Sequence, residues 1–165
     1  MIAMALLCKP QILIADEPTT ALDVTVQAQM LDLFKTLTND FGTALVMITH
    51  DLGVVAGLAD KMMVMYGGRA VEKGAVDELF YDPRHPYTLG LLHSTPHVAL
   101  RAKRLDPIQG TPPSLEHLPQ GCAFHPRCAF RFDRCFSERP PLLELDDGRA
   151  KACWYHGKLA YEEVA

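Results

Sequence analysis

Two adjacent carboxylates follow a short apolar run near the start of the chain. The run covers residues 12–15, and Asp16 and Glu17 come directly after it. Such a run suits a strand that is buried on both faces of a parallel sheet, and ligands bind beyond the carboxyl ends of such strands. Because successive strand residues point to opposite faces, one acid could hold Mg²⁺ while the other polarises a water molecule. Taken alone, the pair could equally be an acidic turn that ends a strand.

Two further polar segments follow at a spacing that fits a phosphate site. Asp23 ends the segment Ala-Leu-Asp shortly after the acids, and His50 follows a second apolar run at residues 44–48. By itself, His50 would be an ordinary histidine at a strand end. Its position downstream of Glu17, at the end of a neighbouring strand, indicates a place in the phosphate site.

The order of these segments resembles the nucleotide-binding subunits of ABC transporters, and the resemblance covers residues 1 to about 80. Asp16 matches the Walker B aspartate, Glu17 the catalytic glutamate, Asp23 the D-loop and His50 the switch histidine. The resemblance implies ATP and Mg²⁺ as cofactors. Asp16 would help to hold Mg²⁺, Glu17 would orient or activate water, and His50 would contact the γ-phosphate. Asp23 would contribute to a dimer interface.

Two segments of that family are absent from this sequence. No Gly-x-x-x-x-Gly-Lys-Ser/Thr occurs, and the Gly-Gly-Arg at residues 67–69 lacks the spacing and the lysine that would cradle a triphosphate. The Ser-Gly-Gly signature is absent too. Residues 1–7 resemble the helix that follows the signature, so we expect Met1 to be an internal residue of a longer subunit. We therefore expect the chain alone not to hydrolyse ATP.

The composition is ordinary for a protein of one domain or two small ones. The 165 residues are 48% hydrophobic with a formal net charge of −4, and no basic stripe predicts nucleic-acid binding. No apolar stretch approaches the ~20 residues that span a bilayer, and no basic segment opens a secretory signal. The pattern favours the cytosol, where the five cysteines are expected to be thiols or metal ligands rather than disulfides.

The first half of the chain predicts an α/β fold. Apolar residues recur on one face at helical spacing between the two runs, which predicts a helix that links parallel strands. These residues are Val26, Met30, Leu33, Phe34 and Leu37. Residues 61–66 and 69–73 flank Gly67-Gly68 and predict a hairpin that closes the sheet edge. Together with the resemblance, this pattern predicts that residues 1–80 form the C-terminal part of the parallel-sheet core of a P-loop NTPase.

Residues 81–165 predict a loop-rich extension. Ten of the twelve prolines follow Tyr81, and such density disfavours long helices and central strands. Residues 82–88 carry a His-Pro-Tyr segment and lead into an apolar helix at 89–92. This segment resembles the region that marks the C-terminal extension of oligopeptide and dipeptide importer ATPases.

Four of the five cysteines lie in the extension: Cys122, Cys128, Cys135 and Cys153, with spacers of five, six and seventeen residues. Four thiolates in a loop-rich segment suit a metal or iron–sulfur centre. The spacers are wider than in most structural zinc sites and could wrap a cubane cluster. Residues 121–128 also resemble a cysteine segment of peptide-importer ATPases, some of which hold a [4Fe–4S] cluster. A [4Fe–4S] cluster is the favoured interpretation; Zn²⁺ and unligated or redox-paired thiols stay open. Cys8 is expected to be buried.

The resemblance implies an ATPase subunit, here in part, that energises ABC-type import of peptides. Its partners would be a second ABC ATPase subunit, as homodimer or heterodimer, transmembrane permease subunits and, indirectly, an extracytoplasmic peptide-binding protein. It would act as a peripheral protein at the cytoplasmic face of the inner cell membrane. Two alternatives stay open. One is an independent iron–sulfur or zinc module with a structural or redox role, and the other is a soluble ABC ATPase without a transport role.

Overall fold

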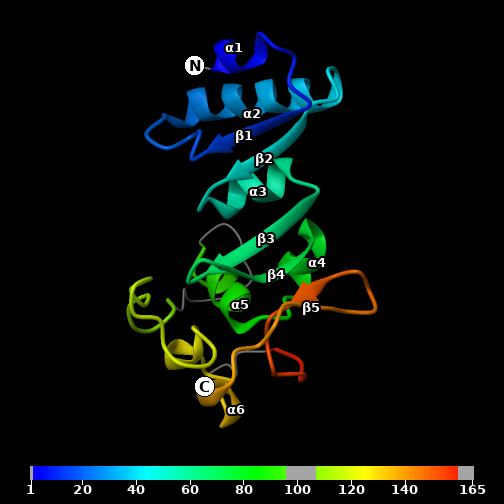
Figure 1. Ribbon diagram of the computed structural model, residues 1–165. Helices are drawn as coiled ribbons and strands as arrows, with labels where there is room; N and C mark the ends of the chain where they lie inside the picture. The colour runs from blue at the N-terminus through cyan, green and yellow to red at the C-terminus, as the bar shows by residue number, and fades with distance from the viewer. Residues whose placement is uncertain (1, 96–106, 160–165) are drawn as a thin grey trace. The chain divides into compact units, whose positions relative to one another are not determined.

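The computed structural model describes residues 2–95 and 107–159, and their contacts divide the chain into two compact units. Unit 1 covers Met1–Leu58 and unit 2 covers Ala59–Ala165. Figure 1 labels the elements of both units along the chain. The boundary between the units lies earlier than the predicted domain boundary at residue 80, because the predicted hairpin packs within unit 2. The division at residue 80 itself stays a prediction.

Unit 1 is a mixed α/β structure around a parallel strand pair. Its elements are α1 (Ile2–Leu6), β1 (Ile12–Asp16), α2 (Val24–Asn39), β2 (Ala44–Ile48) and α3 (Leu52–Leu58). Strands β1 and β2 pair in parallel, in a register that sets Asp16 opposite Ile48. The helix α2 connects them, as expected for a parallel crossover. The predicted mixed α/β class and the linking helix are confirmed.

One face of the strand pair carries the core of unit 1. Leu13 of β1 packs with Phe34 and Leu37 of α2, and all three are buried. The alternate residues Ile12 and Ile14 point to the other face, where they are 61% and 67% exposed. The expectation that β1 is buried on both faces is therefore wrong for this structure, since no described side chain of unit 1 covers the second face.

Asp23 fixes the start of α2. Its side chain accepts hydrogen bonds from the backbone N–H groups of Thr25 (3.0 Å) and Val26 (2.9 Å). These are two of the donors that a helix leaves without an internal partner. Beyond the other end of the helix, Gly42 has a φ of +65°, a conformation that glycine adopts without a steric penalty.

Unit 2 contains an antiparallel sheet of four strands in the order β3-β4-β6-β5. The strands are β3 (Lys61–Tyr66), β4 (Arg69–Ala75), β5 (Leu143–Glu144) and β6 (Ala150–Lys151). The β3–β4 hairpin is confirmed; Gly67 and Gly68 both have positive φ at its turn. The hairpin does not close the sheet on the β4 side, because β6 pairs with β4 from the far end of the chain.

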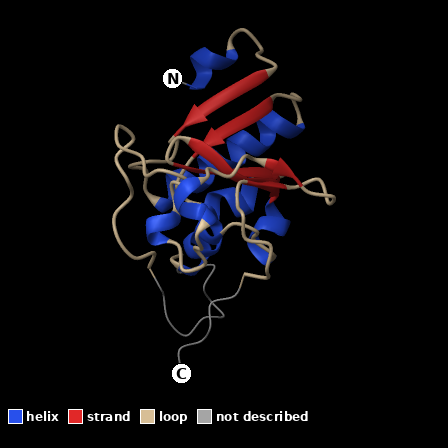
Figure 2. Cartoon of the chain, turned by 60° about the horizontal axis from the view of Figure 1, so that its bottom comes forward, coloured by secondary structure: helices blue, strands red, loops and turns tan. Residues whose placement is uncertain are grey.

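Helices and loops pack around this sheet, and the described residues after α5, 94–95 and 107–159, are mostly loop (Figure 2). The helical elements are α4 (Val76–Tyr81), α5 (Pro86–His93), η2 (His125–Arg127) and α6 (Arg134–Ser137). The core of unit 2 is a cluster of buried residues from the start and the middle of the unit: Val64, Tyr66, Val71, Leu79 and Phe124. No helix of the described ranges is long and apolar enough to cross a membrane.

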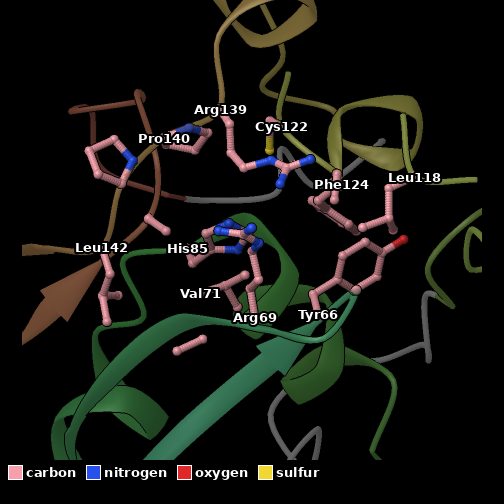
Figure 3. Close-up of a pocket in the computed structure, with 15 residues that line it drawn as sticks. Tyr66, Arg69, Val71, His85, Leu118, Cys122, Phe124, Arg139, Pro140 and Leu142 are labelled. Carbon is pink, nitrogen blue, oxygen red and sulfur yellow. The ribbon is translucent and has the colours of Figure 1, made fainter. Parts of the chain in front are cut away.

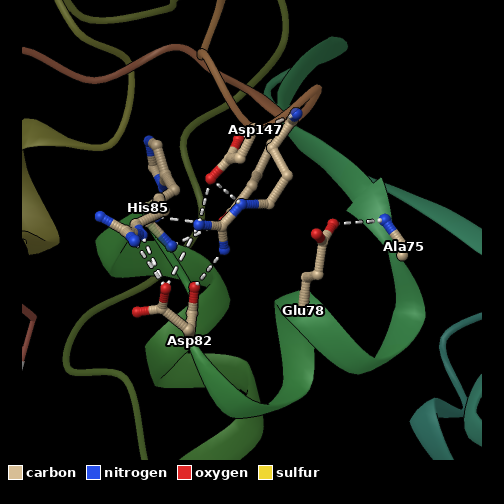
Figure 4. A network of polar contacts seen from close by, with 8 residues as sticks. Ala75, Glu78, Asp82, His85 and Asp147 are labelled. Atoms are coloured by element: carbon tan, nitrogen blue, oxygen red, sulfur yellow. Dashed lines mark hydrogen bonds and ion pairs between the residues drawn. The ribbon is translucent and has the colours of Figure 1, made fainter.

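A buried guanidinium ties the end of α4 to the β5–β6 turn (Figure 4). Arg149 donates to the backbone oxygen of Asp82 at 2.9 Å and to the carboxylate of Asp147 at 2.6 Å. These contacts raise the pKa of Arg149 and lower that of Asp147, because the hydrogen bond between the two side chains stabilises the charged form of each. The network holds together two segments that are 67 residues apart in the sequence.

Candidate functional site

The predicted acid and histidine of unit 1 meet at the ends of its two parallel strands. Glu17 directly follows β1, and its backbone N–H donates to the oxygen of Ile48 on β2 at 2.9 Å. His50 follows β2 and its Nδ1 lies 3.0 Å from Oε1 of Glu17. Both side chains are open to solvent, with 41% of Glu17 and 79% of His50 exposed. The ends of β1 and β2 thus place a carboxylate and an imidazole next to each other, where a ligand can reach both.

Glu17 is held by its neighbours in an unusual conformation. Its φ is +47°, a left-handed value that is uncommon for residues other than glycine. The hydroxyl of Thr20 donates to Oε2 at 2.6 Å. This hydrogen bond, followed by that from His50, lowers the pKa of Glu17, and Glu17 in turn raises the pKa of His50. Sequence reasoning missed Thr20, although its position three residues after Glu17 was a usable signal.

Asp16 and Asp23 lie near this pair in the sequence but have different surroundings. Asp16 ends β1 and is exposed. Asp23 is engaged as the N-cap of α2, so its carboxylate already accepts two hydrogen bonds. Asp51, which was not predicted, caps the start of α3 in the same way and also accepts from the side chain of Gln27 at 3.3 Å. The roles of Asp16 and Asp23 toward a nucleotide stay predictions.

In unit 2, the four late cysteines surround one small cavity of about 10 Å³. The backbone of Cys122 donates to the oxygen of Cys135 at 2.9 Å, which joins two of the four segments directly. No carboxylate, lysine or arginine lines this cavity. Aromatic residues and prolines complete its wall: His85, Pro86, Phe124, His125, Phe130, Pro140, Trp154 and Tyr155. The topology therefore gathers thiols that lie up to 31 positions apart in the sequence. Cys8 lies outside this group and is exposed, so its expected burial is wrong.

Burial makes three of these thiols poor acids. It raises the pKa of Cys122, that of Cys128 to about 12 and that of Cys153 to about 11. These three thiols are therefore protonated and neutral at pH 7. Among the residues described, no group of three or more His, Cys, Asp or Glu side chains is arranged to hold a metal ion. The cysteines share a cavity, and ligation would require their sulfur atoms to turn toward a common centre and to lose their protons.

A buried carboxylate and a buried histidine support this region, and sequence reasoning missed both. Glu72 of β4 is 1% exposed and accepts hydrogen bonds from the backbone N–H groups of Arg84 (2.6 Å) and His85 (3.0 Å). Burial raises the pKa of Glu72. His85 is the N-cap of α5, where its Nδ1 accepts from the N–H of Tyr87 at 3.0 Å. Burial lowers the pKa of His85 to about 3.

A large part of unit 2 matches a known protein family. Residues 71–135 match the family "Oligopeptide/dipeptide transporter, C-terminal region". The matched range begins in β4 and ends at Cys135, so it includes the buried Glu72–His85 pair and three of the four late cysteines. The predicted resemblance to peptide-importer ATPases is confirmed.

Curated oligopeptide transport ATP-binding proteins are similar to this chain over nearly its whole length. The chain is 53% identical to the oligopeptide transport ATP-binding protein OppD of Haemophilus influenzae and 54% identical to OppD of Escherichia coli K12. These matches cover 93% of this chain and 47% and 45% of the relatives. The oligopeptide transport ATP-binding protein AppD of Bacillus subtilis is 49% identical, over 99% of this chain and 50% of that protein. The chain thus spans about half the length of the curated relatives it matches.

Proposed function

We propose that the chain is part of an ATP-hydrolysing subunit that energises ABC-type import of peptides. The observation that carries this proposal is the Glu17–His50 pair, which lies at the carboxyl ends of two adjacent parallel strands. This is where a nucleotide phosphate binds in open α/β sheets. The relatives are named as oligopeptide transport ATP-binding proteins, and the match over residues 71–135 favours a transport role over a soluble ATPase without one.

The geometry supports a division of roles between the acids and the histidine. The Glu17 carboxylate is ionised, because Thr20 and His50 lower its pKa, and it can accept a hydrogen bond from a water molecule and orient it. His50 can donate to a phosphate oxygen, and the nearby carboxylate favours its protonated form. Asp16 offers exposed oxygen ligands for Mg²⁺, which supplies charge neutralisation at the phosphates when bound. We assign Asp23 to a subunit interface, since it is exposed beside the N-terminus of α2.

The exposed face of unit 1 supports a larger parallel sheet in the whole protein. Ile12, Ile14, Val46 and Ile48 are each about half or more exposed on β1 and β2. Apolar strand residues of this kind are ordinarily covered on both faces in parallel sheets. We infer that further elements of a P-loop NTPase core cover this face in the whole protein. A second ATPase subunit, permease subunits and, indirectly, a peptide-binding protein would be the partners, at the cytoplasmic face of the membrane.

The cysteine cavity supports a metal or iron–sulfur centre as a finer part of this proposal. Cys122, Cys128, Cys135 and Cys153 offer four sulfur donors in one apolar enclosure, a donor set that suits a [4Fe–4S] cluster or Zn²⁺. Such a centre would stabilise the loop-rich segment, since metal binding free energy becomes folding free energy. An anaerobic absorption spectrum with iron, sulfide and zinc analysis separates the two centres. Cys122→Ser should lower the metal content, whereas Cys8→Ser, at an exposed position outside the cavity, should not.

The ATPase proposal is tested in a chimera of the E. coli OppD relative, in which this chain replaces the segment it matches. The chimera should hydrolyse ATP and support peptide uptake in cells that lack OppD. Glu17→Gln should preserve ATP binding and reduce hydrolysis by at least ~10²-fold, because it keeps the shape and removes the carboxylate that orients water. The 165-residue chain alone should show no Mg²⁺-dependent turnover.

A matched control is Asp40→Asn, which removes one carboxylate from the exposed end of α2. This variant should hydrolyse ATP at the rate of the parent chimera. Near-parent hydrolysis by the Glu17→Gln chimera, with ATP binding retained, would remove Glu17 from the catalytic role.

A further inference from the structure

Unit 2 contains a second and larger cavity, of about 300 Å³ (Figure 3). It shares His85, Cys122, Phe124 and Pro140 with the cysteine cavity, and no ligand has been assigned to it above. It lies between the β3–β4 hairpin and the loops on either side of α6. Its volume falls at the lower end of the range for small-molecule sites. A cavity of this size that is partly open to solvent can admit a ligand without rearrangement of the sheet.

Two arginines line this cavity, and no carboxylate does. Arg69 begins β4 and Arg139 follows α6, and in Figure 3 their side chains extend from opposite walls toward the middle of the cavity. Neither makes an ion pair within the described ranges 2–95 and 107–159. By contrast, Arg84, Arg134 and Arg149 each form an ion pair with an aspartate or a glutamate.

The two guanidinium groups have free hydrogen-bond donors. Arg139 donates from Nε to the backbone oxygen of Gly121 at a long 3.4 Å, and the described residues provide no acceptor for the side chain of Arg69. An arginine carries five N–H donors in a planar fork that fits a carboxylate or phosphate. Two like charges that face one cavity raise its positive potential, and an anion between them relieves their repulsion.

Most of the remaining wall is apolar, and part of it is tightly packed. Val71, Leu118 and Leu142 line it together with the ring of Phe124. The Tyr66 ring meets that of Phe124 at 5.1 Å, and its hydroxyl accepts a hydrogen bond from Arg127 at 3.3 Å. The part of this surface formed by Tyr66 and Phe124 is therefore already ordered, which lowers the entropic cost of binding an apolar ligand there.

We propose that this cavity binds a small organic anion, with its charged group between Arg69 and Arg139 and its apolar body against the hydrophobic wall. The charged group is a carboxylate or a phosphate monoester, which share the oxygen geometry that a guanidinium recognises. The site lies in unit 2, apart from the residues assigned to ATP hydrolysis, and is a ligand site in its own right.

The probes for the test are 4-methylpentanoate, its neutral amide and 3-methylbutyl phosphate, each added to the full 165-residue chain and followed by calorimetry. At least one anion should bind about tenfold or more tightly than the amide, because it adds charge-assisted hydrogen bonds. The carboxylate and phosphate arms identify which anion the site prefers. Equal affinities of the amide and both anions, or binding of none of the three, would overturn the proposal.

The arginines are tested by substitution. Arg69→Gln and Arg139→Gln should each weaken binding of the preferred anion by about tenfold and leave binding of the amide unchanged. Arg131→Gln is the matched control, because it removes the same charge from an exposed residue that does not line the cavity. Losses of the same size in all three variants would show a general charge effect and refute the site.

Methyl NMR gives a readout that does not depend on the variants. The anion should shift the methyl signals of Leu118 and Leu142, which line the cavity, and leave those of Leu13 in the core of unit 1 unchanged. Shifts at Leu13 without shifts at Leu118 and Leu142 would place the anion elsewhere and overturn the proposal.

Discussion

Acidification should destabilise unit 2 through a single histidine. His85 is 1% exposed, and its Nδ1 accepts a hydrogen bond from the backbone N–H of Tyr87. Burial disfavours the charged ring, and protonation of Nδ1 would also leave two N–H donors facing each other. The folded state therefore holds the neutral ring, and the pKa of His85 falls from 6.5 to about 3.

The sign and size of the effect follow from this pKa. The unfolded chain takes up a proton on His85 below pH 6.5, whereas the folded chain does so only near pH 3. The stability that the neutral ring provides is complete above pH 6.5 and is lost as the pH falls through that value. At about 1.4 kcal/mol for each pH unit, the free energy of unfolding of unit 2 should fall by about 2 kcal/mol between pH 6.5 and pH 5.

Tryptophan fluorescence can measure this loss, because Trp154 is the only tryptophan in the chain and lies in unit 2. The Arg134 guanidinium lies 3.6 Å from the centre of its ring in the folded state, so unfolding should change the emission. Urea unfolding is recorded at several pH values from 7.5 to 5. A constant slope of free energy against urea across the series would show that the same surface unfolds each time.

Two variants separate His85 from the other titrating groups. His85→Asn keeps an N-cap acceptor but does not titrate, so its stability should be lower at pH 7.5 and should fall less steeply below pH 6.5. His156→Asn, at an exposed position, should keep the parental slope. If His85→Asn loses stability with pH as steeply as the parent, the buried histidine is not the cause and the reasoning is refuted.

Three further perturbations test other parts of the structure. Gly121→Ala should destabilise unit 2 by about 3 kcal/mol or more, because its new Cβ would clash with the backbone oxygen of Cys135 at a φ of +72°. Gly148→Ala, at a φ of +81° with open space around it, should cost only about 1 kcal/mol in the same urea assay. Asp23→Ala should lower the stability of unit 1 by about 1 kcal/mol through loss of the N-cap, as measured by thermal unfolding, and an unchanged melting temperature would contradict the capping role. Glu17→Gln should lower the pKa of His50 in an NMR titration of the chain, since the carboxylate is the main cause that raises it; an unaltered titration curve would show that the two side chains do not meet in solution.

The parts of the structure that were predictable from sequence depend on local patterns. Strand β1 follows from its apolar run, and the β3–β4 turn follows from Gly67 and Gly68, which can adopt positive φ. The prediction that β1 is buried on both faces was wrong, because periodicity shows which residues are apolar and cannot show whether anything covers them. The exposed Ile12 and Ile14 are the result.

The parts that were not predictable depend on distant segments that meet. No local signal pairs Glu72 with Lys151 across β4 and β6, or brings Arg149 to Asp82. The buried state of His85 follows from the same closure, because residues from the end of the chain cover it. The sequence indicated that four cysteines lie in one segment, whereas their common cavity requires this folded arrangement. Their ligand stays a prediction.

The pairing of β6 with β4 also has a consequence for the order of events during synthesis. The β3–β4 hairpin can form as soon as it leaves the ribosome, because its contacts are local. Its partner β6 is made roughly 75 residues later, which takes about 4 to 15 s at ordinary rates of translation. During that time the outer edge of β4 has unpaired backbone groups, and such an edge can pair with another chain. The nascent protein is therefore most exposed to misassembly in this interval, which ends when Ala150 and Lys151 reach β4.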